Sequence, residues 1–171
     1  MSRDGRDLTL AVYPAVSVTG EVGLFHPASV RWLGLSAMTA TRCLMLGRAP
    51  LLGFLARHPA AMQRMFESLS TAAVQAAYSA SGMAFQSIGG RVATLLMHLA
   101  DEYGESTPEG VRIRLRLSQG DLAAYVGASR ENVNRALAVL VGRGVVSQRS
   151  GYFHVHDLVA LESTTKEDAD L

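Results

Sequence analysis

The sequence predicts an α+β fold in three parts: a β-rich N-terminal segment, one long helix, and C-terminal helices closed by a hairpin. Three observations predict it. Short alternating apolar runs occur before residue 50, a heptad-spaced apolar stripe covers residues 59–84, and helix caps and turn residues recur between residues 118 and 152. Of the 171 residues, 49% are hydrophobic and 18% are charged, so the chain can bury a core and is not disordered.

Composition excludes several classes of protein. The N-terminus has no apolar signal-peptide core, and no apolar run reaches the roughly 18 residues that a membrane helix needs. We therefore expect a cytoplasmic protein without a membrane partner. The single cysteine, Cys43, excludes an intrachain disulfide framework and a four-cysteine zinc or iron–sulfur site.

The charge is unevenly distributed along the chain. Residues 111–151 hold seven arginines against Asp121 and Glu131, a net charge of +5, whereas the remainder carries −4. A basic C-terminal block on a mildly acidic body is typical of a protein that binds a polyanion. A solvated basic face is the alternative that charge alone leaves open.

The N-terminal segment alternates in the manner of β-strands. Leu8, Leu10 and Val12 alternate with polar or small residues before Pro14. The predicted strands are residues 7–13, 17–20 and 39–46. Residues 50–58 predict a short helix that ends before Pro59. No predicted strand has a complete set of partners, so the segment resembles part of a β-domain.

The long helix carries an apolar stripe in 4-3 spacing. Its members are Met62, Phe66, Leu69, Ala73, Ala76, Ala80 and Met83. This spacing is an a/d seam, and a helix of about 25 residues spans nearly 40 Å at 1.5 Å per residue. We expect a two-fold dimer through this seam. Packing of the stripe against the chain's own β-domain is the alternative.

The following residues predict a second set of elements. Ser87 can cap a helix whose apolar face is Val92, Leu95, Leu96 and Leu99. Residues 105–110 predict a loop, and residues 111–117 predict a strand with Arg112, Arg114 and Arg116 on its outer face. Residues 163–171 are polar and are expected to form a flexible tail.

Residues 118–156 have the pattern of a winged helix-turn-helix. Ser118 and Asp121 resemble a capping box for a helix over residues 119–126, Gly127 interrupts it, and Ser129 caps a second helix. The second helix buries Val133, Ala136, Leu137 and Leu140, and Gly142 and Gly144 end it. Residues 145–157 predict a hairpin, with Phe153 and Val155 inward and Tyr152, His154 and His156 outward.

The start of the second helix explains its charged residues. In this motif it points into the major groove of DNA, where Arg bonds guanine O6 and N7 and Glu accepts from cytosine N4. We expect Arg130, Glu131 and Arg135 to read bases. Residues expected to contact phosphate or to form the turn are Gln119, Ser129, Asn134 and Arg149. A surface helix with a Glu131–Arg135 pair is the alternative.

The sequence resembles the cyclic-AMP receptor protein (Crp/Fnr) family of bacterial transcription regulators. The resemblance covers nearly all of residues 1–162 and includes GEVGLF, the long helix, GGRVATLLMHLA and SRENVNR, in the family's order. It implies a cyclic-nucleotide-binding-like β-roll, a dimerisation helix and a winged helix-turn-helix. The implied domains are residues 1–58, 59–84 and 85–162. It also implies that Arg130, Glu131 and Arg135 read a palindromic TGTGA-like site.

Two departures from the family are visible. The family's β-roll begins well before the first residue here, so the first part of the roll is expected to be missing, and its open strand edges need a covering partner. The ligand-binding segment is also altered. Glu21 and Arg31 match, but Trp32 replaces a serine, and Ala76 and Ala77 replace a Thr-Ser pair.

We therefore expect a homodimeric regulator of double-stranded DNA that does not depend on cyclic AMP, with RNA polymerase as a further candidate partner and no cofactor. A cyclic-nucleotide-responsive regulator and a dimeric protein-interaction module are the alternatives. An enzyme is disfavoured because His26, His58 and His98 lie far apart without an adjacent nucleophile. His154 and His156 share a strand face, but wing residues near phosphate are favoured over a metal site.

Overall fold

The computed structural model describes residues 8–26 and 33–166, which divide into two compact units. One unit comprises residues 16–76, and the other combines the N-terminal residues up to 15 with residues 77–171. The helix α3 (Pro59–Phe85) runs from one unit into the other. In the described part of the chain, no helix is long and apolar enough to cross a membrane.

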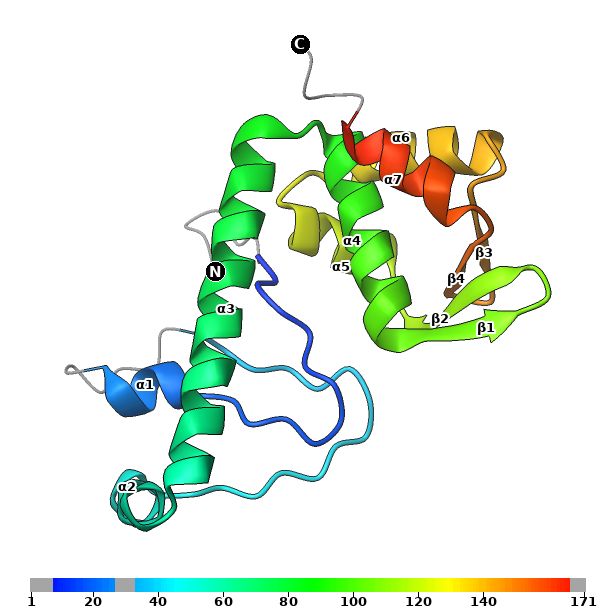
Figure 1. The fold of residues 1–171 in the computed structure, drawn as a ribbon. Coiled ribbons are helices and arrows are strands. Elements are labelled where there is room, and N and C mark those ends of the chain that lie inside the picture. The colour runs from blue at the N-terminus through cyan, green and yellow to red at the C-terminus, as the bar shows by residue number, and fades with distance from the viewer. Residues whose placement is uncertain (1–7, 27–32, 167–171) are drawn as a thin grey trace. The chain divides into compact units, whose positions relative to one another are not determined.

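The unit that contains the C-terminal residues combines four helices with a small sheet (Figure 1). Its elements are α4 (Ile88–Tyr103), β1 (Gly104–Thr107), β2 (Gly110–Arg116), α5 (Gln119–Val126), α6 (Arg130–Gly142), β3 (Val146–Arg149), β4 (Tyr152–Val155) and α7 (Leu158–Lys166). The sheet has the order β1-β2-β4-β3 and is antiparallel throughout. The pair β3–β4 is the predicted wing.

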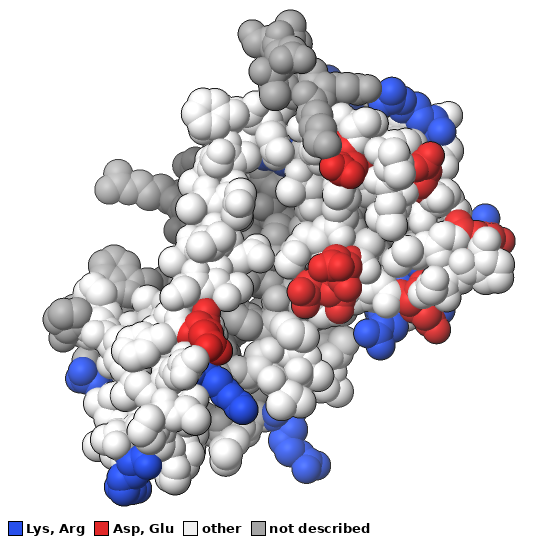
Figure 2. All heavy atoms as spheres, in the orientation of Figure 1, with Lys and Arg blue, Asp and Glu red and all other residues white. Residues whose placement is uncertain are grey.

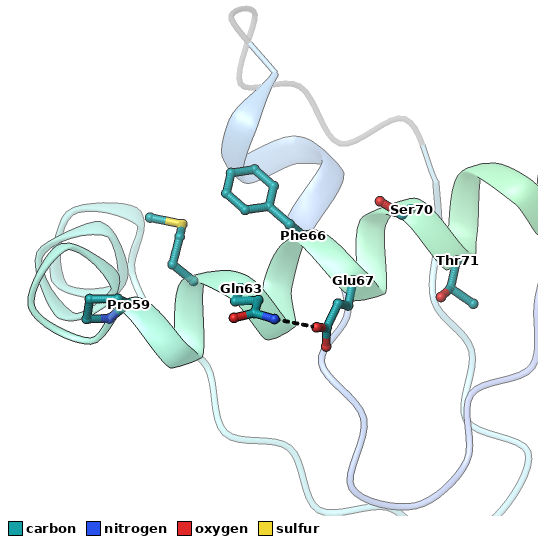
Figure 3. Close-up of a pocket in the computed structure, with 7 residues that line it drawn as sticks. Pro59, Gln63, Phe66, Glu67, Ser70 and Thr71 are labelled. Carbon is teal, nitrogen blue, oxygen red and sulfur yellow. Dashed lines mark hydrogen bonds between the residues drawn. The ribbon is translucent and has the colours of Figure 1, made fainter.

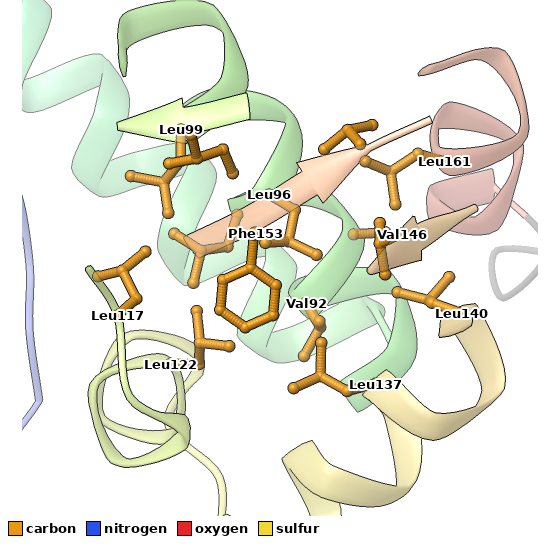
Figure 4. Packing of buried hydrophobic residues seen from close by; sticks show 14 of the residues in the cluster. Val92, Leu96, Leu99, Leu117, Leu122, Leu137, Leu140, Val146, Phe153 and Leu161 are labelled. Atoms are coloured by element: carbon orange, nitrogen blue, oxygen red, sulfur yellow. The ribbon is translucent and has the colours of Figure 1, made fainter. Parts of the chain in front are cut away.

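The core of this unit lies between α4, the sheet and the helices α5, α6 and α7. Phe153, which is 1% exposed, points from β4 into the middle of this cluster (Figure 4). Around it are Val92, Leu96, Leu99, Leu122, Leu137, Leu140, Val146 and Leu161. The predicted apolar faces of α4 and α6 are therefore confirmed, and Ser87 caps α4 as expected by accepting a hydrogen bond from the Gly90 amide at 3.1 Å.

Two predictions for this unit need correction, and its sheet contains one irregularity. Residues 105–107, expected in a loop, lie in β1 because β2 offers them an antiparallel partner. A register shift interrupts the pairing of β2 with β4 between Arg112 and Arg116. Residues 163–166, expected in the flexible tail, continue α7, which the completely buried Leu161 anchors in the core.

The N-terminal unit has a small core of its own. Its elements are α1 (Glu21–Phe25), α2 (Arg48–Arg57) and the first part of α3. Leu24, Leu55 and Met65 form its buried cluster, with Leu51, Met62 and Leu69 packed around them. The predicted helix before Pro59 is thus confirmed as α2.

The strands predicted for residues 7–13, 17–20 and 39–46 are wrong. None of the described residues among 8–26 and 33–58 lies in a strand. A strand needs the backbone groups of a neighbour, and alternation of apolar residues provides only the side-chain pattern. The segment retains the apolar residues of a sheet without its hydrogen bonds, which leaves Leu44 and Met45 more than four-fifths exposed.

The first described residues pack on the unit that holds the C-terminal helices. The Thr9 amide donates to the Ala124 carbonyl of α5 at 2.9 Å. The Val12 amide donates to the Tyr125 hydroxyl at 3.2 Å, and the Tyr103 hydroxyl donates to the Val12 carbonyl at 3.1 Å. Residues 8–12 are therefore an extended strap, held by two phenols and one helix carbonyl rather than by a sheet.

Candidate nucleic-acid interface

The first helix of the motif begins at a complete capping box. The Ser118 hydroxyl accepts from the Asp121 amide at 3.1 Å, and the Ser118 amide donates to Asp121 Oδ2 at 2.7 Å. These bonds satisfy two backbone donors that a helix start leaves unpaired and place a carboxylate at the positive end of the helix dipole. Gln119, the first residue of α5, is exposed beside this cap.

The turn between the two helices depends on Gly127. Its φ of 64° lies in the left-handed region, where residues with a Cβ are strained. The Ala128 amide donates back to the Ala123 carbonyl at 3.1 Å, and an Arg91 guanidinium nitrogen donates to the Val126 carbonyl at 2.7 Å. The carbonyl groups at the end of α5 are thus hydrogen-bonded both by Arg91 of α4 and by the turn. These bonds fix the direction in which α6 starts.

The second helix is anchored by one side and free on the other. Ser129 caps it by accepting from the Asn132 amide at 3.3 Å. Val133, Leu137 and Leu140 are at most 6% exposed and face the core. The predicted base-reading residues and Asn134 are all exposed. The structure therefore brings Arg130, Glu131, Asn134 and Arg135 together on the open side of a rigidly held helix.

The side chains on this surface differ in how they are bonded. Arg135 donates to the Asn132 Oδ1 atom of the same helix. Arg130 and Glu131 have neither a hydrogen bond nor an ion pair to any residue that the structure describes. The Glu131–Arg135 pair of the alternative interpretation is not formed. Of the three predicted base-reading side chains, Arg130 and Glu131 therefore have no partner among the described residues and are available to bind a ligand.

The predicted phosphate contact on the wing is engaged in an ion pair. Arg149 Nη1 lies 2.9 Å from Glu109 Oε2, and both side chains are more than half exposed. A second pair joins Arg112 to Glu105 at 3.8 Å. Figure 2 shows acidic and basic side chains next to each other over the sheet, so the positive charge of residues 111–151 is partly balanced there. An exposed ion pair contributes about 0–1 kcal/mol and can exchange for a phosphate.

Sequence reasoning missed an arginine–tyrosine cluster on the outer face of the sheet. The guanidinium carbons of Arg112 and Arg116 lie 4.5 and 5.3 Å from the centre of the Tyr152 ring. The strand pairing places Arg112 opposite His154 and Arg116 opposite Tyr152. The alternation of apolar and polar residues indicated which side chains of residues 111–117 and of the hairpin face outward. Only the pairing of β2 with β4 shows that these outward side chains form one surface.

The two wing histidines have structural partners. His156 Nδ1 lies 2.7 Å from the Glu109 carbonyl oxygen, and its Nε2 lies 2.8 Å from the Ser147 hydroxyl. The His154 ring stacks on it at a centroid distance of 6.4 Å. Within the described residues, no group of three His, Cys, Asp or Glu side chains could hold a metal ion. His156 therefore joins β3 to the β1–β2 turn.

The altered ligand segment is only partly described. Glu21 is 5% exposed, and its Oε2 atom has no hydrogen-bond partner. Arg31 and Trp32 lie outside the described residues. Ala76 and Ala77 are exposed on α3 and carry no polar side-chain atom. Of the two polar residues expected to bind a ligand in this segment, the structure describes Glu21 and does not describe Arg31.

The predicted dimer seam divides into two halves on α3. Met62 and Leu69 are partly buried against the N-terminal unit's own cluster, and the Phe66 ring stacks on Phe25 at 6.3 Å. A shallow hollow runs along the same stretch (Figure 3), lined by Pro59, Met62, Gln63, Phe66, Glu67, Ser70 and Thr71. The seam positions Ala73, Ala76 and Ala80 are exposed. The first half of the seam thus packs partly against the core of the N-terminal unit, whereas the second half is exposed.

The two capped helices, the turn at Gly127 and the β3–β4 hairpin define a winged helix-turn-helix protein. Residues 90–164 match the family model of the Crp-like helix-turn-helix domain. The CRP-like cAMP-activated global transcriptional regulator of Mycobacterium tuberculosis is 30% identical over 141 residues, covering 82% of this chain and 62% of that protein. The global nitrogen regulator of Synechocystis is 28% identical over 158 residues, covering 92% of this chain and 70% of that protein.

Solved structures agree with these matches. The c-di-GMP-responsive global regulator CLP of Xanthomonas campestris has a TM-score of 0.70 at 24% identity, and the match covers 91% of this chain and 77% of that one. A CooA mutant of Carboxydothermus hydrogenoformans has a TM-score of 0.64 at 20% identity, covering 68% of this chain and 54% of that one.

Residues 90–164 thus form a Crp-like helix-turn-helix domain, and the chain is similar in sequence and in fold to regulators of the Crp/Fnr family. This confirms the resemblance and the α+β class, with a long helix followed by a winged helix-turn-helix. The described residues of the segment expected to be part of a β-roll contain no strand. The chain spans 62% of the length of the mycobacterial relative.

Proposed function

We propose that this protein is a dimeric transcription regulator that binds DNA sequence-specifically through α6. The observation that carries the proposal is the set of exposed side chains on a helix whose opposite side is locked in the core. Arg130 and Glu131 have no competing partner among the described residues, so no bond must be broken before they reach a base. The match of residues 90–164 to the Crp-like helix-turn-helix domain supports the same conclusion.

Arg130, Glu131 and Arg135 are proposed to read base edges. Arg can place two parallel hydrogen bonds on guanine O6 and N7, and Glu can accept from the amino group of cytosine. Arg135 must exchange its bond to Asn132 for one to a base, and Asn132 lies one turn earlier on the same helix. The proposed target is a TGTGA-like half-site.

Phosphate contacts are proposed at the helix starts and on the wing. Gln119 and Ser129 lie where the unpaired amides and the helix dipole favour an anion. Asn134 lies on the open side of α6, and Arg149 can exchange Glu109 for a phosphate. Such contacts orient the protein on the duplex without selecting a sequence.

The proposed dimer places two copies of α6 in successive major grooves. For related motifs the half-sites lie about 34 Å, or one helical turn, apart, which requires a pseudo-palindromic site. The exposed part of the α3 seam supports this arrangement. Bound there, the protein would alter transcription through RNA polymerase, by contacting it or by blocking its access.

We also propose that DNA binding does not require cyclic AMP. Ala76 and Ala77 offer no hydrogen bond, and each missing bond removes about 1 kcal/mol from the binding of a nucleotide. The relatives named above include one cAMP-activated, one c-di-GMP-responsive and one nitrogen regulator, so similarity does not define a common effector. The buried, unpartnered Glu21 Oε2 favours a second candidate, a cyclic-nucleotide-responsive regulator. Calorimetric titration with cyclic AMP separates the two.

Selection of sites from random DNA tests the proposal. The wild type should select a pseudo-palindrome, and Arg135→Ala should lose its preference at one base pair of each half-site, at a cost of about 1–3 kcal/mol. An unchanged preference in the variant would show that α6 does not read bases where we place it. Binding of all fragments alike by the wild type would refute sequence-specific regulation, and the absence of binding to any fragment would favour a dimeric interaction module without DNA binding.

A further inference from the structure

We propose that Gly120 is a positioning residue for base reading, because the absence of a side chain at this position leaves the space in which the Arg130 guanidinium lies. The inference rests on the proposed function and adds a determinant of specificity on α5, which is not the helix that reads bases. Arg130 touches the base in this account, and Gly120 acts only through it.

The geometry at Gly120 is tight and specific. A Cβ built on this residue would lie 3.0 Å from Arg130 Nη2, 3.1 Å from its Nε and 3.2 Å from its Cζ. The three nearest atoms all belong to one guanidinium group. They are closer than nine in ten real contacts of a Cβ, so a Cβ at this position would require the guanidinium to move by a few tenths of an ångström.

The backbone gives no other reason for glycine here. The φ of Gly120 lies outside the left-handed region, in contrast to Gly127 with a φ of 64°. Gly120 is the second residue of α5, where alanine would favour the helix. Gly120 weakens its own helix and is not needed for a turn. The space that it leaves for Arg130 explains why glycine is present here.

The consequence concerns the direction of the Arg130 side chain. Arg130 is the first residue of α6, and its guanidinium reaches back across the turn to the first turn of α5. Placing it against the backbone of Gly120 restricts its rotamers before DNA arrives, which reduces the entropy lost on binding. A methyl group at position 120 would displace the guanidinium from this position by a few tenths of an ångström. Two parallel bonds to guanine would then no longer be aligned in advance.

The test combines site selection with a double-mutant cycle of Gly120→Ala and Arg130→Ala. Gly120→Ala should reduce discrimination at the base pair read by Arg130 about tenfold, within the range for one bidentate contact. In the Arg130→Ala background the same substitution should change nothing. Gly142→Ala is the matched control, because a Cβ there meets nothing within 4 Å. Its preferences should equal those of the wild type.

Two further readouts separate the possible failures. Thermal unfolding of Gly120→Ala should occur at the same or a higher temperature than in the wild type, so a folding defect would not explain the result. The NMR signal of the Arg130 Nε–H group should shift in Gly120→Ala without DNA and stay in place in Gly142→Ala. A selective wild type with an equally selective Gly120→Ala, or an equal loss in both backgrounds, overturns the inference alone. A wild type that selects no sequence overturns the proposed function and this role with it.

Discussion

At the scale of single residues, the candidate interface contains cations of two kinds. Arg130 lies against another helix without a bond, whereas Arg149 forms an ion pair with Glu109 at 2.9 Å. Both are exposed, yet their expected contributions to DNA binding differ. A base-reading arginine changes which sequence is bound, and a phosphate-binding arginine changes how strongly every sequence is bound.

Arg149→Ala should weaken binding to specific and random DNA by a similar factor. Each phosphate contact releases about one counterion, so the slope of log affinity against log salt should fall by about one unit per protomer. Titrations at several salt concentrations measure this slope. Because the Glu109 carboxylate competes for the same guanidinium, Glu109→Gln is the matched variant and should strengthen binding to all sequences. A change of base preference in Arg149→Ala would assign the wing to direct base reading instead.

At the scale of elements, the strap of residues 8–12 links the N-terminal residues to α4 and α5. Its polar contacts are the two phenols of Tyr103 and Tyr125 and the Ala124 carbonyl. Burial raises the pKa of both phenols above the ordinary value of 10.0; nearby Glu102 adds to the effect at Tyr103, and the hydrogen bond from the Val12 amide opposes it at Tyr125. The neutral phenols are therefore favoured by folding.

A group whose pKa is raised by folding contributes stability that is complete below its unfolded pKa and lost as the pH rises through its folded pKa. We therefore expect the free energy of unfolding to fall as the pH rises above about 10, the ordinary pKa of tyrosine. In Tyr103→Phe/Tyr125→Phe the fall should be smaller, and at pH 8 Tyr125→Phe alone should cost about 1 kcal/mol through the lost bond. Urea unfolding at pH 8 and pH 11 measures both. Tyr78→Phe, at a residue that is 75% exposed, is the control. An equal pH dependence in the double variant and the wild type would contradict this assignment.

The elements also show what the sequence could and could not predict. The helix limits at Ser118, Val126, Gly127 and Ser129 are defined by caps and by one left-handed glycine, which act between neighbours along the chain. The strands predicted before residue 50 depended on partners that the described chain does not supply. The candidate site could also be predicted only in part. Periodicity places Arg130 on the exposed side of α6 but does not show that its guanidinium lies against Gly120.

At the scale of the whole molecule, the proposed specific binding would depend on joining two weak half-sites through a dimer. The exposed seam positions Ala73, Ala76 and Ala80 permit close approach of a second α3, whereas Leu69 also packs on the N-terminal unit's own cluster. A charge at Leu69 would therefore disturb the fold of that unit as well as the proposed dimer. Ala73 is the cleaner position for a test, because its side chain is exposed and is not part of that cluster.

Ala73→Glu should yield monomers, because the two-fold axis would bring two carboxylates together in a seam that excludes water. Light scattering should show the mass of one chain, and affinity for the palindrome should fall toward that for random DNA, since the second half-site no longer binds at high effective concentration. Gln75→Glu, which adds a charge at an exposed position outside the stripe, should remain dimeric and selective. If Ala73→Glu stays dimeric while Gln75→Glu dissociates, the dimer uses a different face of α3. If both stay dimeric, α3 does not form the interface, and the half-site spacing must be set by another surface of the chain.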